Sequence, residues 1–161
     1  DWKSANGTPS KNNGDLYDTM MELVHAAIKG QEIASVTFVW MQGERDAKMG
    51  WGNLYEEALV GLHAQLAKDL EWNPKDMAFV IGRLSDFDMK NKRYPHWTKV
   101  REAQIKVADS SPKFSWVDTD DLNDGKNRKG KDIKDDLHYS AEGYKTLGLR
   151  FAEASLKSIG K

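Results

Sequence analysis

Short hydrophobic runs alternate with stretches of helical periodicity along most of this chain. Three runs of mainly β-branched and aromatic residues predict strands that are buried on both faces, as in a parallel sheet. These runs span residues 35–41, 77–81 and 114–117. Apolar residues at helical spacing predict four helices around and between them. The helices span residues 16–29, 54–70, 95–109 and 141–157.

The predicted elements follow the order helix, strand, helix, strand, helix, strand, helix. This alternation indicates an α/β fold with a parallel sheet and right-handed crossovers. Residues 1–14 are rich in Lys, Asn, Ser and Gly, which predicts a loop or a disordered segment. Neither an internal repeat nor a linker divides the rest, and 161 residues suit one domain. We therefore interpret residues 1–161 as a single domain.

Composition and charge narrow the classes of function. The 24 basic and 25 acidic residues leave a formal net charge of −1, which gives no general reason to expect nucleic acid or a membrane surface as a partner. The absence of cysteine excludes disulfides, thiolate zinc sites and a cysteine nucleophile. His25, His63 and His96 lack metal-ligand spacing, and the acidic segment 118–124 lacks the register of a calcium loop. We expect no metal site and no cofactor.

The first candidate site follows the strand predicted at residues 35–41. Gln42, Gly43 and Glu44 come directly after this apolar run, and ligands bind just beyond the carboxyl ends of strands in open α/β sheets. The Gln42 amide could donate to an oxyanion that develops during a reaction. The alternative is a strand-ending turn with solvated acids. Trp51 is a candidate for stacking on a ligand ring, although packing is the commoner role of such aromatic residues.

The second candidate site precedes the last predicted helix. Asp135 lies three residues before His138, so its carboxylate can turn back onto the imidazole, fix the tautomer and stabilise the imidazolium. Asp136 is the alternative orienting group, and the spacing favours Asp135. Taken alone, D-x-x-H is a weak pattern, and the cluster favours a helix N-terminus with nearby acids and an incidental histidine. Because both candidate sites follow strands at one edge of the predicted sheet, together they favour a joint site.

Three motifs, considered together, resemble those of a known family. They are W-x-Q-G-E-x-D at residues 40–46, V-x-T-D-D-L at 117–122 and D-L-H-Y-x-x-x-G-Y-x-x-L-G-x-R-x-A at 136–152. The set resembles the sialate O-acetylesterase and acetylxylan esterase-like branch of the SGNH hydrolases, from about residue 16 onward. The resemblance implies a three-layer α/β/α sandwich with a flavodoxin-like parallel sheet. It also implies removal of O-acetyl groups from sugars by a Ser-His-Asp mechanism that uses no metal.

The resemblance also implies roles for the matched residues. His138 and Asp135 match the family's catalytic D-x-x-H pair. Gln42 matches its oxyanion glutamine, with Gly43 beside it. The resemblance assigns no chemical role to Glu44, which we expect to brace the loop and which, like Trp51, is a candidate for lining the site.

The chain departs from the family at the nucleophile. The family's serine lies in a G-Q-S-N block on the first strand, and this block is absent here. Ser35 would enter a strand at its wrong end, Ser85 lacks a nucleophile-turn pattern, and Ser140 is too close in sequence to His138. We therefore expect that this chain is the C-terminal portion of the domain and lacks the N-terminal strand or strands. We also expect that the chain alone is inactive. An N-terminal segment or a second chain would supply the serine.

The sequence thus predicts a carbohydrate O-acetyl esterase, a carboxylic ester hydrolase acting on acetylated sugars or polysaccharides once the serine is present. Such substrates would suit a secreted or periplasmic protein. The rival interpretation is a non-catalytic carbohydrate-binding or interaction module of the same fold, which the missing serine favours if the chain is naturally complete.

Overall fold

A computed structural model describes residues 15–160, so the loop expected at residues 1–14 lies outside the described part. The chain divides into two compact units, Asp1–Val36 and Thr37–Lys161. In the first unit, helix α1 spans Asp15–Ile28 and matches the helix expected at residues 16–29. The second unit contains the sheet and the remaining helices. None of the described helices is long and apolar enough to cross a membrane.

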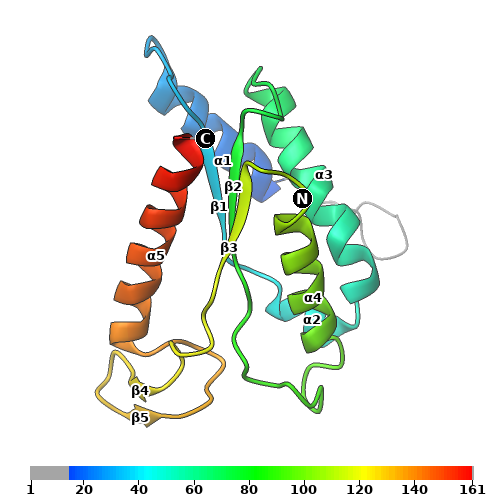
Figure 1. The fold of residues 1–161 in the computed structure, drawn as a ribbon, viewed down its shortest axis with the longest axis vertical. Helices are drawn as coiled ribbons and strands as arrows, with labels where there is room; N and C mark the ends of the chain where they lie inside the picture. Colours follow the sequence, from blue (N-terminus) through cyan, green and yellow to red (C-terminus); the bar gives the residue numbers. More distant parts are fainter. Residues whose placement is uncertain (1–14, 161) are drawn as a thin grey trace. The chain divides into compact units, whose positions relative to one another are not determined.

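Three parallel strands form the main sheet of the second unit (Figure 1). Strand β1 (Thr37–Trp40) pairs with β2 (Ala78–Gly82), and β2 pairs with β3 (Phe114–Val117). Every residue of the central strand β2 is buried, as its continuous apolar run predicts for a strand covered on both faces. The expected parallel sheet is confirmed. β1 lies at one edge of this sheet, with β2 as its partner strand.

Helices cover both faces of the sheet. Figure 1 shows α3 (Gly52–Asp69) and α4 (Trp97–Ala108) on one side and α5 (Ala141–Ile159) on the other. Side chains of β2 alternate between two cores: Phe79 and Ile81 pack with α3 and α4, whereas Val80 packs with α5. This arrangement gives three layers and is consistent with the flavodoxin-like SGNH hydrolase fold.

Two short elements were not predicted from the sequence. Helix α2 (Glu44–Met49) begins directly after Gly43, and β4 (Gly125–Lys126) pairs with β5 (Asp132–Ile133) in an antiparallel hairpin. Both are polar and very short, so neither gives a hydrophobic period that can be recognised.

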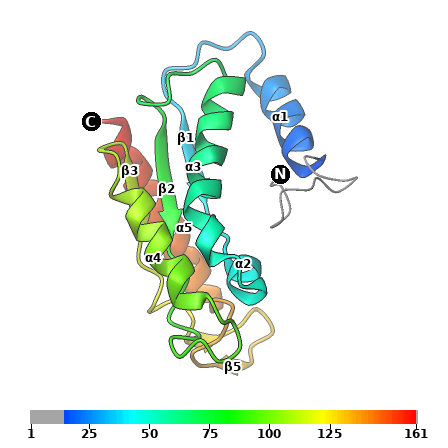
Figure 2. The ribbon, with the colours of Figure 1, turned by 90° about the vertical axis from the view of Figure 1, so that its right-hand side faces the viewer.

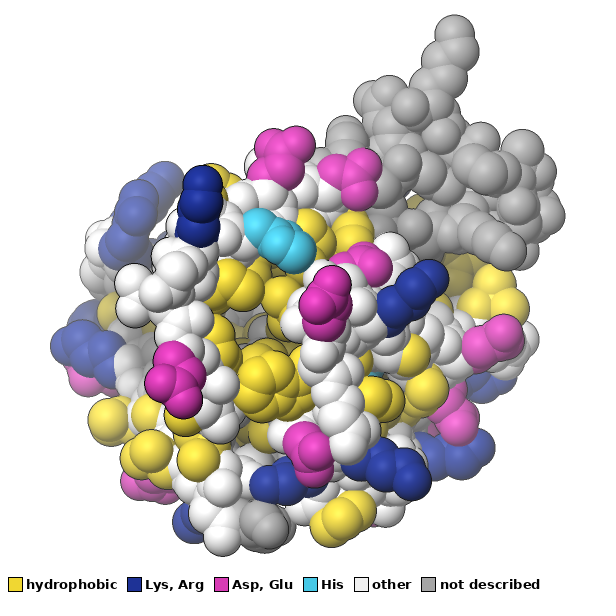
Figure 3. Space-filling model, turned by 90° about the horizontal axis from the view of Figure 1, so that it is seen from above, with side chains coloured by type: hydrophobic (Ala, Val, Ile, Leu, Met, Phe, Trp, Pro, Cys, Tyr) yellow, Lys and Arg dark blue, Asp and Glu magenta, His cyan; other side chains and the backbone are white. Residues whose placement is uncertain are grey.

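The polar connections gather at the carboxyl ends of the strands. Figure 1 shows α2, the β4–β5 hairpin and the start of α5 in the lower half of the view, and Figure 2 shows α2 and the hairpin below the sheet from the side. The lower edge is therefore the place to look for chemistry. The opposite side, seen from above in Figure 3, has interspersed basic and acidic side chains among the described residues.

Candidate active site

A buried polar network holds the backbone where β1 ends. The carbonyl oxygen of Gln42 accepts hydrogen bonds from the Tyr55 hydroxyl (2.5 Å) and from Gln104 Nε2 (3.0 Å). Trp40 Nε1 donates to the same Tyr55 hydroxyl (3.0 Å), and the Gln104 side-chain oxygen accepts from the Leu84 amide (2.8 Å). Burial raises the pKa of Tyr55, so the hydroxyl keeps its proton and remains a donor. The network fixes the position of Gln42 relative to α3 and α4.

Sequence reasoning missed this network. Gln104 is fully buried in α4, on the same stripe as Val100 and Val107. A glutamine at an apolar position of a helix is the signal that could have found it, because a buried amide needs hydrogen-bond partners.

Gly43 adopts a backbone conformation that side chains disfavour. Its φ is 148°, and an added Cβ would lie 2.7 Å from Val100 Cγ1 and 3.1 Å from the Tyr55 hydroxyl oxygen. Its N–H donates to Glu44 Oε2 at 3.0 Å. Close packing and the positive φ therefore require a glycine at this position, and the Glu44 carboxylate accepts its N–H.

The side chain of Gln42 is oriented by one carboxylate. Its Nε2 donates to Asp46 Oδ2 at 2.9 Å, and its Oε1 is buried without a hydrogen-bond partner within the described part of the chain. An amide nitrogen carries two hydrogens, and the bond to Asp46 uses one. The Gln42 amide is thus held in a fixed direction and retains a second donor.

Asp136, rather than Asp135, lies next to the His138 ring. Asp136 Oδ1 is 3.6 Å from His138 Nδ1 and accepts a hydrogen bond from the His138 backbone N–H at 2.9 Å. Asp135 has a φ of 44°, and its own N–H donates to Asp124 Oδ1 at 2.8 Å. Within the described part of the chain, no ion pair or hydrogen bond joins Asp135 to His138, the partner that the D-x-x-H spacing favoured. The His138 side chain is 75% exposed.

Tyr139 links the two candidate sites. Its hydroxyl donates to Met41 Sδ at 3.8 Å, and these residues directly follow His138 and precede Gln42. Burial raises the pKa of Tyr139, and the charge of Glu44 raises it further. The contact with Met41 places Tyr139 beside the end of β1. The structure therefore brings the His138 segment and the Gln42 segment to the same edge of the sheet.

The start of α5 fixes the segment that carries His138. Ser140 caps this helix by accepting from the Gly143 N–H at 3.0 Å, and its own N–H donates to the Leu122 carbonyl oxygen at 2.9 Å. A Cβ at Gly143 would lie 2.1 Å from that same carbonyl oxygen. Ser140 is buried, and its side chain caps α5.

Two arginines and two aspartates join the ends of β2 and β3. Arg83 lies 2.5 Å from Asp118 and 2.7 Å from Asp120, and Arg101 lies 2.7 Å from Asp120. Desolvation raises the pKa of Asp120, but hydrogen bonds and charge from both arginines outweigh it and leave the pKa below its usual value. Asp120 belongs to the V-x-T-D-D-L motif and could be recognised from the sequence. Its partners Arg83 and Arg101 could not, because they come from distant segments of the chain.

Trp51, Ser85 and Ser35 take no part in the contacts described above for the Gln42 and His138 segments. Trp51 is half-buried, and its N–H donates to the Asp46 carbonyl oxygen; no described contact joins its ring to His138. Ser85 is buried beneath Trp97, whose Nε1 donates to the Ser85 carbonyl oxygen at 2.7 Å. Ser35 precedes β1 and belongs to the first unit. Within residues 15–160, no cluster of His, Asp or Glu has the arrangement of a metal site.

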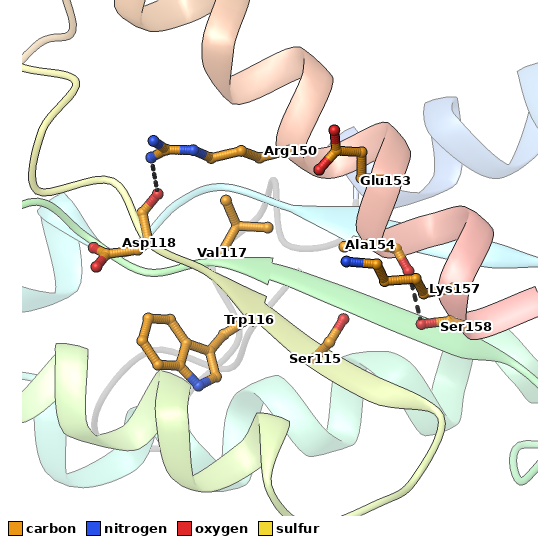
Figure 4. Close-up of a pocket in the computed structure, with 9 residues that line it drawn as sticks. All are labelled: Ser115, Trp116, Val117, Asp118, Arg150, Glu153, Ala154, Lys157 and Ser158. Atoms are coloured by element: carbon orange, nitrogen blue, oxygen red, sulfur yellow. Dashed lines mark hydrogen bonds between the residues drawn. The ribbon is translucent and has the colours of Figure 1, made fainter.

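A groove between β3 and α5 lies outside the candidate site. It has a volume of about 290 Å³, and its lining includes Trp116, Arg150 and Lys157 (Figure 4). Neither Gln42 nor His138 contributes to it. Arg150 is already occupied by the Asp121 carboxylate and the Asp118 carbonyl oxygen.

Comparison with known families identifies the family of the chain. Residues 2–157 match the model of a family described as carbohydrate esterase, sialic acid-specific acetylesterase. No curated protein matches the chain. Because the family match spans nearly the entire sequence, the chain belongs to the sialic acid-specific acetylesterase family of carbohydrate esterases.

Proposed function

We propose that this chain carries the acid–base and oxyanion groups of an enzyme that removes O-acetyl groups from sugars, with the nucleophilic serine supplied from outside the chain. The observation that carries the proposal is the contact between Tyr139 and Met41, which holds the His138 and Gln42 segments at one sheet edge. Membership of a carbohydrate esterase family supports the reaction class.

In the proposed reaction, the serine hydroxyl attacks the acetyl carbonyl carbon while His138 takes the hydroxyl proton. The carbonyl oxygen becomes an oxyanion, and the free N–H of the Gln42 amide donates to it. His138 then returns the proton to the sugar oxygen as the bond to the acetyl group breaks. Water, activated by His138, hydrolyses the acetyl-serine and releases acetate. The high exposure of the His138 ring leaves it accessible to these partners.

Gly43 and Glu44 would act differently in this site. The Gly43 N–H is occupied by Glu44, so we assign the oxyanion contact to the Gln42 side chain and not to this backbone amide. Glu44 would hold the loop conformation. We propose that Trp51 lines the sugar side of the site.

Two carboxylates compete for the role of orienting His138. The D-x-x-H match favours Asp135, whereas the 3.6 Å approach to the ring favours Asp136. Both remain candidates for the group that holds Nδ1 in the completed site.

The edge position of β1 supports an external source for the serine. β1 has β2 on one side, and no other described strand pairs with it. A further strand paired along its other side would end beside Gln42, because parallel strands deliver their carboxyl ends to one edge. A unit of strand, helix and strand needs roughly 30 residues or more.

Acetyl-ester hydrolysis tests the proposal. The purified 161-residue chain should be inactive, and addition of an N-terminal segment with a G-Q-S-N block, in the same chain or as a separate one, should create activity. Substitution of its serine by alanine is the control. Robust activity from the 161-residue chain alone, blocked by a serine-directed reagent on one of its own serines, would overturn it. Binding of acetylated sugar that never gives turnover with any such segment would favour the non-catalytic module instead.

A further inference from the structure

The β4–β5 hairpin concentrates positive charge beside the candidate active site. Five cations and one anion lie within residues 126–134, a local net charge of +4 in a chain whose total is −1. All five cationic residues are exposed; they are Lys126, Arg128, Lys129, Lys131 and Lys134. Lys126 pairs with Asp132 at 2.8 Å, whereas the other four form no ion pair in the described part of the chain. Elsewhere at this edge, Arg83, Arg101 and Arg150 each contact an aspartate.

The tip of the hairpin is a built turn. Asn127 Oδ1 accepts from the backbone N–H groups of Lys129 (2.9 Å) and Lys131 (3.1 Å). The backbone of Asn127 also bonds to Lys131 and to Gly130, which has a φ of 77°. Four hydrogen bonds from one residue therefore fix the turn that displays Arg128 and Lys129. Ordering the turn in advance lowers the entropic cost of binding a partner.

The hairpin is placed to contact a substrate that extends beyond one sugar. β5 ends at Ile133, five residues before His138, and β4 contacts α5. Figure 1 shows the hairpin next to the beginning of α5. At about 3.3 Å per residue, Arg128 can stand up to roughly 10 Å from Gly125. The acids at the hairpin base, Asp124 and Asp135, would repel a polyanion there, so the tip is the favourable point of contact.

We propose that the hairpin tip binds a carboxylate-bearing polysaccharide, holding negatively charged units that neighbour the acetylated sugar at His138. The proposal rests on the proposed esterase function for its placement of the acetylated unit. Arg128 offers paired N–H donors that match a carboxylate, and Lys129 and Lys131 add point charges. A single acetylated monosaccharide has no neighbouring acidic units for the tip to bind, so the hairpin would select polymeric, acidic substrates over small or neutral ones.

Binding of unacetylated polygalacturonate to the 161-residue chain tests this surface without requiring hydrolysis. Neutral dextran is the matched uncharged polymer. The test variant combines Arg128→Gln, Lys129→Gln and Lys131→Gln. A control variant combines Lys68→Gln, Lys75→Gln and Lys157→Gln, which removes the same charge from three exposed positions away from the hairpin. Titration calorimetry at several salt concentrations gives the affinity and its salt dependence.

We expect the wild-type chain and the control variant to bind polygalacturonate and not to bind dextran. An exposed ion pair alters an equilibrium by about 1.5- to 5-fold, so the hairpin variant should bind about tenfold more weakly. Its affinity should also depend less steeply on salt, because fewer counterions are released. Circular dichroism of each variant verifies that the fold is retained.

Three results would overturn the inference: no binding by the wild-type chain, equal weakening in both triple variants, or tighter binding to single-stranded DNA than to polygalacturonate. The last result would identify a nucleic-acid surface. Failure of the binding experiment leaves acetyl-ester hydrolysis untouched, and failure of hydrolysis leaves binding measurable, so the two proposals can fail separately.

Discussion

Substitution of Tyr55 by phenylalanine isolates the contribution of the buried network beneath Gln42. The change removes one hydroxyl and leaves the aromatic ring, which is 4% exposed, in place. The hydroxyl donates to the Gln42 carbonyl oxygen and accepts from Trp40 Nε1 and Gln104 Nε2. After the change, the Gln42 oxygen and Gln104 Nε2 still have each other, but Trp40 Nε1 loses its bond.

The expected loss of stability follows from this difference. A buried polar group left without a partner costs about 1–3 kcal/mol, and the Nε1 of the half-buried Trp40 is the group so affected. We therefore expect Tyr55→Phe to lower the free energy of unfolding by about 2 kcal/mol. For a domain of this size, this corresponds to a decrease in Tm of roughly 4–8 °C.

Urea denaturation followed by tryptophan fluorescence measures the effect, and Tyr144→Phe is the matched control. Tyr144 is 53% exposed, so loss of its hydroxyl should change stability by no more than about 0.5 kcal/mol. A Tyr55→Phe variant as stable as the wild-type chain, with an unchanged m-value, would show that the network does not hold the Gln42 loop.

Three further predictions concern catalysis and pH. In the enzyme completed with its serine, Gln42→Ala should lower kcat about a hundredfold with little change in KM, because an oxyanion donor acts mainly in the transition state; unchanged kcat on an acetyl ester would remove Gln42 from this role. Asp135→Asn and Asp136→Asn should differ in the same kinetic assay, the larger loss identifying the group that orients His138; equal, small losses would exclude both. Burial lowers the pKa of His63, so the unfolded chain binds the proton more tightly and the stability of the fold should decrease as the pH drops below about 6.5. Denaturant midpoints measured between pH 7.5 and 5.5 should therefore depend less on pH in His63→Gln than in the wild-type chain, and an identical dependence would contradict this.

The sequence predicted the strands and long helices well because burial leaves a readable pattern. The run Phe114–Val117 coincides with β3, and the expected helix starts lie within two residues of those observed. Helix α2 could not be predicted, since it has six residues and depends on the glycine turn before it and on tertiary contacts. The hairpin could not be predicted because Asn127, which folds its tip, acts through hydrogen bonds that no hydrophobic period reveals.

The candidate site shows the same division. Spacing along the chain placed His138 and Gln42 at one edge, and the Tyr139–Met41 contact agrees with this placement. Spacing did not indicate that the Asp136 carboxylate lies 3.6 Å from the His138 ring, nor that Asp135 has a positive φ. A separation of three residues indicates that a carboxylate can reach an imidazole, but the backbone conformation determines which way each side chain points.

The packing of Gly143 against the Leu122 carbonyl oxygen affects how the family motif should be interpreted. The glycine in D-L-H-Y-x-x-x-G leaves no room for a Cβ, since α5 rests directly on a backbone oxygen. This requirement acts on folding and would persist in a descendant that had lost its serine and its activity. In such a descendant, the glycine would be retained for longer than the histidine five positions before it. A match to this half of the motif therefore records shared architecture, and catalytic competence must be judged from the nucleophile instead.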